Sequence, residues 1–138
     1  MKQVIRFLVA RAAFVSIAAL LSVPFAARAE ETSPANIGLV TYSKTANPGT
    51  LIARWTFDNR YFGPGLATGG PAEGFAGNYH VRYFLENGQF SDEYDLQVAN
   101  DGGFYDVTWR VGGVVKARGV GMLVDNGTTL AVGWHRAG

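Results

Sequence analysis

Histidine, carboxylate and hydroxyl side chains come together at one place in the predicted sheet, where they are candidates for chemistry. The registers derived below put His80, Asp95 and Thr108 side by side on its outer face. A histidine beside a carboxylate is half of an acid–base pair. The same arrangement is also an ordinary cross-strand ion pair on a solvated sheet. Because an outward face offers no cleft and no Ser or Cys nucleophile adjoins it, we expect a surface ion pair and no enzyme.

The remaining polar residues indicate neither a metal nor a cofactor. The two histidines, His80 and His135, fall strands apart without a third ligand, and the chain has no cysteine. Gly63-Pro64-Gly65 followed by Gly69-Gly70 does not fit the spacing of a phosphate-binding loop and opens no helix. We therefore expect no metal site and no cofactor.

Aromatic side chains on the inner face of the sheet are the stronger candidates for a binding function. Buried phenol and indole groups need hydrogen-bond partners. In a filled barrel they satisfy one another through ordered water. Alternatively, they line a cavity at one barrel mouth, where an apolar or aromatic ligand would meet a few polar groups. The candidate ligand-binding residues are Trp55, Tyr79, Tyr94, Tyr105, Trp109 and Trp134.

A glycine-rich stretch, residues 58–77, is the second candidate for binding. It holds six glycines and two prolines, so we interpret it as a long loop. A loop of this length is uncommon unless it is a lid, a binding loop or disordered. Its aromatic residues Tyr61, Phe62 and Phe75 would then be candidate anchors for a protein or glycan partner.

The elements that position these side chains are short runs in which apolar and polar residues alternate, which predicts an all-β fold. Short turns join the runs in meander order, which favours an antiparallel up-and-down barrel or curled sheet of seven or eight strands. An eighth strand would have to lie within residues 58–77. The seven visible strands are predicted over residues 38–44, 50–57, 78–85, 90–98, 104–111, 115–124 and 128–135.

Two Asn-Gly pairs predict hairpin turns that fix the pairing of four strands. The turn at Asn87-Gly88 sets Tyr79 opposite Leu96, and the turn at 126–127 sets Gly119 opposite Trp134. Both registers place apolar groups on one face and polar or small groups on the other, as a half-buried antiparallel sheet requires.

The turn at 112–114 and the loop at 100–103 contain no Asn-Gly pair, so their lengths are less clear from the sequence. A three-residue turn at Gly112-Gly113-Val114 would set Trp109 opposite Ala117, whereas a two-residue turn would bring Lys116 inside. We therefore expect the three-residue turn.

The loop at 100–103 completes a ladder of opposite charges on the outer face. It would place Glu93 between Arg82 and Arg110, and Asp95 between His80 and Thr108.

The N-terminus reads as an export signal. Lys2, Arg6 and Arg11 precede an uncharged, mostly apolar run over residues 12–23, and Ala27-Arg28-Ala29 is a cleavage pattern. The uncharged run is too short to cross a bilayer, which takes about 20 residues. We predict a signal peptide over residues 1–29, a flexible leader over 30–36 and a β-barrel domain over 37–138. The mature chain would have no membrane span and would be periplasmic or secreted.

Cleavage would change the charge balance of the protein. It would remove four of the 12 basic residues and none of the 11 acidic residues, leaving a net charge of −3. The basic character therefore belongs to the leader, and nucleic-acid binding is not indicated.

Short glycine and aromatic runs in the second half of the chain carry a family resemblance. The runs are Gly77-Asn78-Tyr79-His80-Val81-Arg82-Tyr83, Tyr105-Asp106-Val107-Thr108-Trp109, Gly119-Val120-Gly121 and Leu130-Ala131-Val132-Gly133-Trp134. In these runs the chain resembles small exported bacterial proteins with avidin-like or calycin-like barrels, most of them uncharacterised and some labelled fibronectin-binding. The resemblance covers roughly residues 77–134 and implies fold and export only; it transfers no functional residue.

These observations favour an exported binding protein without catalytic activity. The first expectation is a small apolar or aromatic ligand in the barrel interior. The alternative is an envelope or host-surface interaction module, adhesin-like or inhibitor-like, that uses residues 58–77.

Overall fold

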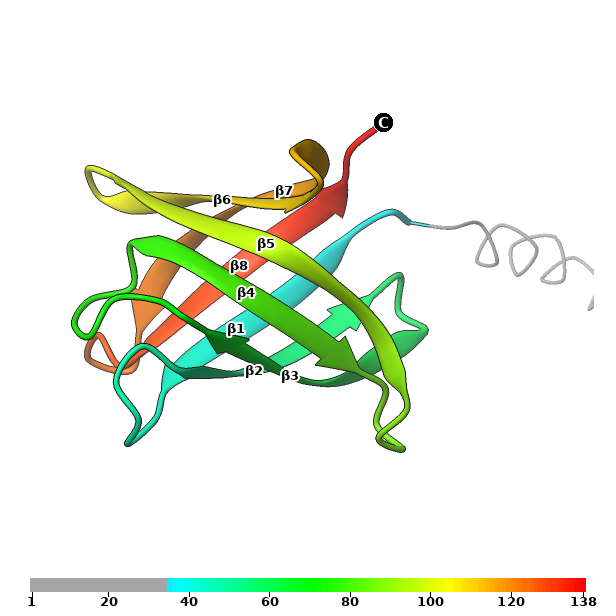
Figure 1. Cartoon of the computed structure of the whole chain (residues 1–138). Coiled ribbons are helices and arrows are strands. Elements are labelled where there is room, and N and C mark those ends of the chain that lie inside the picture. Colours follow the sequence, from blue (N-terminus) through cyan, green and yellow to red (C-terminus); the bar gives the residue numbers. More distant parts are fainter. Residues whose placement is uncertain (1–34) are drawn as a thin grey trace, which may run out of the picture. The chain divides into compact units, whose positions relative to one another are not determined.

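Eight antiparallel strands wind once around a barrel in the order of the sequence, and β1 pairs with β8 to close it (Figure 1). The computed structural model describes residues 35–138; the predicted signal peptide and residues 30–34 lie outside them. Among the described residues no helix is long and apolar enough to span a membrane. The strands are β1 (Gly38–Lys44), β2 (Leu51–Phe57), β3 (Tyr61–Thr68), β4 (Gly77–Phe84), β5 (Phe90–Asp101), β6 (Phe104–Val111), β7 (Val114–Val124) and β8 (Thr129–Arg136). The predicted all-β up-and-down barrel is confirmed.

Alternation along each strand separates a buried inner face from an exposed outer face. In β4, Tyr79, Val81 and Tyr83 are buried, whereas His80 and Arg82 are exposed. Since successive side chains of a strand point to opposite faces, this period-two pattern sends the apolar set inward.

The predicted inner registers are also confirmed. Tyr79 pairs with Leu96, and Trp109 pairs with Ala117. Gly119 lies opposite Trp134, so a large inner side chain faces a small one across the strands.

The prediction of a long loop over residues 58–77 is wrong, because β3 occupies its first half. The glycines that signalled a turn are required by packing instead. A Cβ on Gly63 would lie 2.0 Å from the Phe84 carbonyl oxygen, and one on Gly65 would lie 2.7 Å from the Tyr83 ring. Pro64 pairs with Arg54 of β2. It has no pairing partner on β4, because pairing of β3 with β4 begins only at Gly65, so the missing N–H of Pro64 is tolerated.

The connection between β6 and β7 is a two-residue turn, not the predicted three-residue turn. Val111 pairs with Val114 across Gly112-Gly113. A β-bulge then shifts the register, because Arg110 pairs with Val115 while Trp109 pairs with Ala117. The extra residue, Lys116, stays exposed. The bulge thus preserves the predicted inner face that a regular two-residue hairpin would have lost.

The connection between β5 and β6 is tighter than predicted, which moves the outer-face pairing by two residues. Arg110 lies opposite Asp95 and not beside Glu93, because β5 extends to Asp101 and pairs there with Phe104. The outer face still alternates in charge, with Arg82 Nε 3.3 Å from Glu93 Oε1. Exposed pairs of this kind add little to stability.

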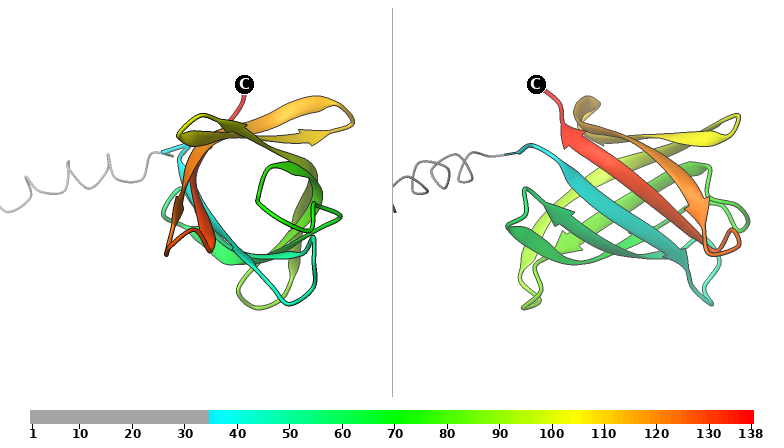
Figure 2. Two further views of the ribbon diagram at one scale, coloured as in Figure 1. Left: turned by 90° about the vertical axis from the view of Figure 1, so that its left-hand side faces the viewer. Right: turned by 180° about the vertical axis from the view of Figure 1, so that it is seen from behind.

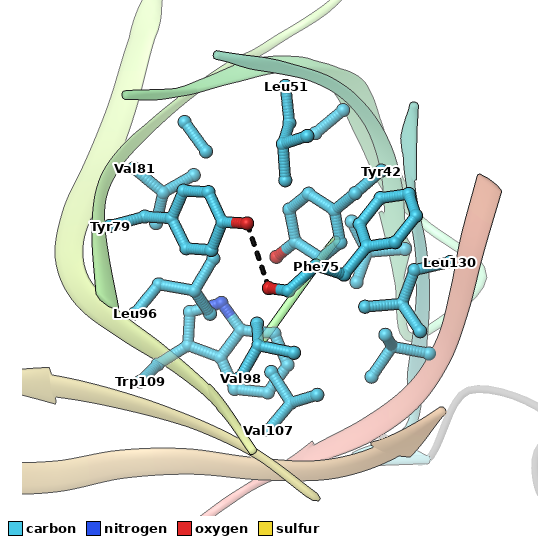
Figure 3. Close-up of a cluster of buried hydrophobic side chains, with 14 of the residues drawn as sticks. Tyr42, Leu51, Phe75, Tyr79, Val81, Leu96, Val98, Val107, Trp109 and Leu130 are labelled. Atoms are coloured by element: carbon cyan, nitrogen blue, oxygen red, sulfur yellow. Dashed lines mark hydrogen bonds between the residues drawn. The ribbon is translucent and has the colours of Figure 1, made fainter. Parts of the chain in front are cut away.

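The two ends of the barrel differ. The loop between β3 and β4 folds across one end, which we call the plugged end (Figure 2, left). From this loop Phe75 enters the core, where its side chain is 2% exposed. Its carbonyl oxygen accepts a hydrogen bond of 2.8 Å from Tyr79 Oη (Figure 3). The opposite end, which we call the open end, carries the β2–β3, β4–β5 and β6–β7 turns and the C-terminus.

Residues 35 and 36, assigned to the flexible leader, are hydrogen-bonded to the barrel. Asn36 Oδ1 accepts a bond of 2.9 Å from the Arg136 backbone N–H. The Ala35 N–H donates to the buried Asp58 carboxylate. The chain therefore joins the barrel just before β1 begins.

Candidate ligand-binding site

A cavity of about 620 Å³ lies inside the open end of the barrel. This volume is within the roughly 300–1,000 Å³ typical of small-molecule sites. Its walls are mainly apolar, and charged side chains lie at its mouth. The apolar and aromatic lining residues are Val40, Trp55, Phe57, Tyr61, Tyr83, Leu85, Tyr94, Trp109, Val111, Ala117, Trp134 and Ala137.

A buried hydrogen-bond network holds two of these aromatic side chains in place. Trp109 Nε1 donates to Tyr83 Oη at 2.8 Å, and the Tyr83 and Tyr42 hydroxyl groups are 2.5 Å apart. Loss of contact with water raises the pKa of Tyr42 and of Tyr83 well above the usual tyrosine value. Both phenols are therefore neutral hydrogen-bonding groups at physiological pH.

The other two indole rings are held in different ways. Trp55 Nε1 donates to the Phe84 carbonyl oxygen at 3.0 Å and to that of Pro64 at 3.2 Å. Trp134 stacks on Phe57, with ring centroids 4.9 Å apart. Its ring lies 5.9 Å from that of Trp109. Because packing or hydrogen bonds fix these rings, the cavity walls are largely preformed.

The mouth of the cavity carries charges of both signs. Tyr94 Oη donates to Asp92 Oδ2 at 2.5 Å. Burial, followed by this contact with the carboxylate, raises the pKa of Tyr94. Lys116 and Arg136 also line the mouth and are exposed.

Four of the six predicted ligand-binding residues lie together at this cavity: Trp55, Tyr94, Trp109 and Trp134. Tyr79 is not among them, because it lies toward the plugged end and bonds to Phe75. Tyr105 lies at the start of β6, beside the β5–β6 turn at the same end; it pairs with Gly121 and packs against the core.

The three aromatic residues predicted for partner binding do not form one surface. Tyr61 lines the mouth of the cavity. Phe62 lies on the outer wall and is 51% exposed, whereas Phe75 is buried at the plugged end.

The cavity has further lining residues that were not predicted as ligand-binding residues, among them Phe57, Tyr83 and Asp92. All three follow the alternation already recognised in their strands. In β2, Phe57 turns inward with Trp55. In β4, Tyr83 turns inward with Val81, and in β5, Asp92 turns inward with Tyr94. The signal was present. Their place at the cavity depended on which barrel end is plugged, and strand pattern does not contain that information.

The polar cluster around His80 lies on the outer wall. His80 Nδ1 is 3.7 Å from Asp95 Oδ1, and His80 Nε2 is 3.5 Å from Glu93 Oε1. Thr108 pairs with Gln97 and not with Asp95. Within residues 35–138 no three His, Cys, Asp or Glu side chains gather closely enough to hold a metal ion.

A second hollow, of about 850 Å³, is an open depression on the outer surface at β1, β7 and β8. Its lining includes glycines and exposed side chains such as Leu39 and Val120. The inner cavity is the better candidate site, because its walls enclose a ligand and carry ordered polar groups.

Comparison of the chain with protein-family models, curated proteins and solved structures gave no match.

Proposed function

We propose that this protein is an exported binding protein that takes one small apolar or aromatic ligand through the open end of its barrel, without catalysing a reaction on it. The observation that carries this proposal is the aromatic cavity of about 620 Å³ inside the open end. Removing an apolar ligand from water into such a space is favourable. The N-terminal pattern of charges, apolar run and Ala27-Arg28-Ala29 supports export. N-terminal sequencing of the purified protein should then begin at Glu30.

The walls support binding more than catalysis. The indole and phenol groups of Trp55, Tyr83 and Trp109 are already bonded within the protein, so they provide shape and fixed dipoles. The alternative of a loop surface for an envelope or host partner has less support. Its three anchors point in different directions, and Phe75 is buried.

Binding can be tested with N-phenyl-1-naphthylamine, a neutral aromatic probe whose fluorescence rises out of water. We expect saturable binding of one probe per barrel. The substitution Ala117→Leu puts a larger side chain into the cavity wall. It should weaken binding of the probe by about tenfold or more, since a tenfold loss of affinity corresponds to only about 1.4 kcal/mol of binding free energy. The matched control, Ala131→Leu, changes a residue of β8 that alternates with the buried Leu130 and Val132, and should leave binding unchanged.

A second variant covers the case in which Ala117→Leu does not fold. Val111 lies at the mouth and is 47% exposed, so Val111→Trp should obstruct entry without disturbing the core. Circular dichroism checks that each variant keeps its strands. Probe binding that is not saturable, or that neither cavity variant weakens, would overturn the proposal.

A further inference from the structure

Among the described residues, an acidic side chain, Asp92, faces into the cavity without a basic side chain beside it. Asp92 lies on the inner face of β5, in line with Tyr94 and Leu96, and its side chain is half-buried. Its carboxylate accepts one hydrogen bond from within the protein, from Tyr94 Oη. Among residues 35–138 no Lys, Arg or His nitrogen approaches within 4 Å of it.

Glu93, the other acidic residue at this cavity, is directed elsewhere. Its Oε1 lies 3.3 Å from Arg82 Nε and 3.5 Å from His80 Nε2, on the outer wall. Asp92 is therefore the carboxylate that a bound molecule would meet. A carboxylate has about four acceptor positions, and Tyr94 uses one of them.

We propose that the ligand carries a protonated amine on an aromatic or apolar body, and that Asp92 binds this amine. The inference rests on the proposed function of the cavity and specifies its ligand class. The amine would gain a charge-assisted hydrogen bond at a partly dehydrated site. Aromatic rings line the same space, and cations are attracted to such rings. The Tyr94 hydroxyl, bonded to Oδ2, holds the carboxylate in position.

The two cationic side chains at the mouth are weaker anchors for the opposite charge. The Arg136 guanidinium carbon lies 4.7 Å from the centre of the Phe57 ring, so that group already has a partner. Lys116 and Arg136 are exposed, and exposed charges are screened by water and salt more strongly than partly buried ones. An anionic ligand would therefore gain less at this mouth than an amine gains at Asp92.

Three probes that share one ring system separate the charge effect from the apolar contribution. Tryptamine is cationic, indole is neutral and indole-3-acetate is anionic; isothermal titration calorimetry at neutral pH and low salt gives their affinities. We expect tryptamine to bind about tenfold or more tightly than indole, and indole-3-acetate to bind most weakly.

The variant Asp92→Asn removes the charge and keeps an oxygen that accepts the Tyr94 hydrogen bond. It should abolish the advantage of tryptamine while leaving the affinity for indole unchanged. The matched control is Asp95→Asn, three residues along the same strand and on the outer wall, where the side chain is 72% exposed. That substitution should leave all three affinities unchanged.

Each other outcome overturns the inference. Equal affinity for tryptamine and indole, tighter binding of indole-3-acetate, or an advantage of tryptamine that survives in Asp92→Asn would each show that Asp92 does not anchor an amine. The same holds if the naphthylamine probe binds and tryptamine does not. In all these cases the proposed function stands while the naphthylamine probe binds the cavity. The proposed function falls if that probe does not bind saturably, or if neither cavity variant weakens its binding.

Discussion

Two glycines on neighbouring strands, Gly119 on β7 and Gly133 on β8, differ in whether their surroundings leave room for a side chain. A Cβ on Gly119 would lie 2.6 Å from the Gly133 carbonyl oxygen and 3.0 Å from Trp134 Cβ. A Cβ on Gly133 would meet nothing within 4 Å. The first glycine is therefore required by close packing, and the second is not.

This difference predicts opposite results for two identical substitutions. Gly119→Ala should lower the free energy of unfolding by roughly 1–3 kcal/mol, because the backbone of β8 must shift to admit the methyl group. Gly133→Ala should be neutral or slightly stabilising, since alanine restricts the unfolded chain at no steric cost. Urea unfolding monitored by tryptophan fluorescence measures both. Equal shifts of the two midpoints would contradict the assigned inner and outer faces.

The loop between β3 and β4 closes one end of the barrel as a plug. Lys44 Nζ donates to the Gly74 carbonyl oxygen at 2.6 Å, and its ammonium lies 4.8 Å from the centre of the Phe75 ring. On the other side, the Gly70 N–H donates to the Gly49 carbonyl oxygen at 3.1 Å. These bonds tie the loop to the β1–β2 turn, so Phe75 is held as part of the core.

Removing the plug should therefore cost as much as a change in the core. Phe75→Ala should destabilise the protein by roughly 3–5 kcal/mol, the range for truncating a buried phenylalanine. The matched control is Phe62→Ala, which removes the same side chain from the outer wall and should change stability by about 0.5 kcal/mol or less. Thermal or urea unfolding compares the two. A loss of similar size in both variants would mean that the loop does not plug the barrel.

For the whole molecule, closure means that every strand has two neighbours. β1 pairs with β8 from Gly38 to Ser43, so the first and last strands of the sheet pair with each other and neither is left as an exposed edge strand. Closure also keeps water from the inner face, where burial raises the pKa of Tyr42, Tyr79, Tyr83 and Tyr94. The folded barrel therefore keeps these phenols protonated at a pH at which the unfolded chain, with tyrosine pKa values of about 10, loses the protons.

The sign of this effect predicts unfolding in alkali. Below pH about 10 both states hold the tyrosine protons, and the stability is fully present. Above it the unfolded state binds fewer protons, so stability falls by up to about 1.4 kcal/mol per pH unit for each affected tyrosine. Urea unfolding across this pH range should show the decline. A Tyr42→Phe variant should show a shallower one.

The ultraviolet absorbance of tyrosinate supplies an independent check. Because burial raises the pKa of Tyr42 and Tyr83, part of the tyrosinate signal from the six tyrosines should appear only as the barrel unfolds. Full ionisation near pH 10 in a chain that keeps its far-ultraviolet circular dichroism would contradict it.

Local sequence pattern was enough to predict that the fold is all-β, where most of the strands lie and which side chains face inward. These features depend on local alternation and on turn residues near each strand, as at Asn126-Gly127, where the predicted pairing of Gly119 with Trp134 holds. The same alternation placed Trp55, Tyr94, Trp109 and Trp134 on the inner face, so four lining residues of the cavity could be named in advance.

Local pattern did not predict the bounds of β3, the bulge at Lys116 or which end of the barrel stays open, because these depend on contacts between distant parts of the chain. Gly63 and Gly65 read locally as turn residues, yet they are small because Phe84 and Tyr83, about 20 residues away, pack against them. Phe75 reads locally as an exposed loop residue, but bonds from Lys44 to Gly74 and from Tyr79 to Phe75 hold the loop across the barrel. Such contacts join residues that approach one another only after the sheet has closed. They fix where the interior is filled and where the cavity remains.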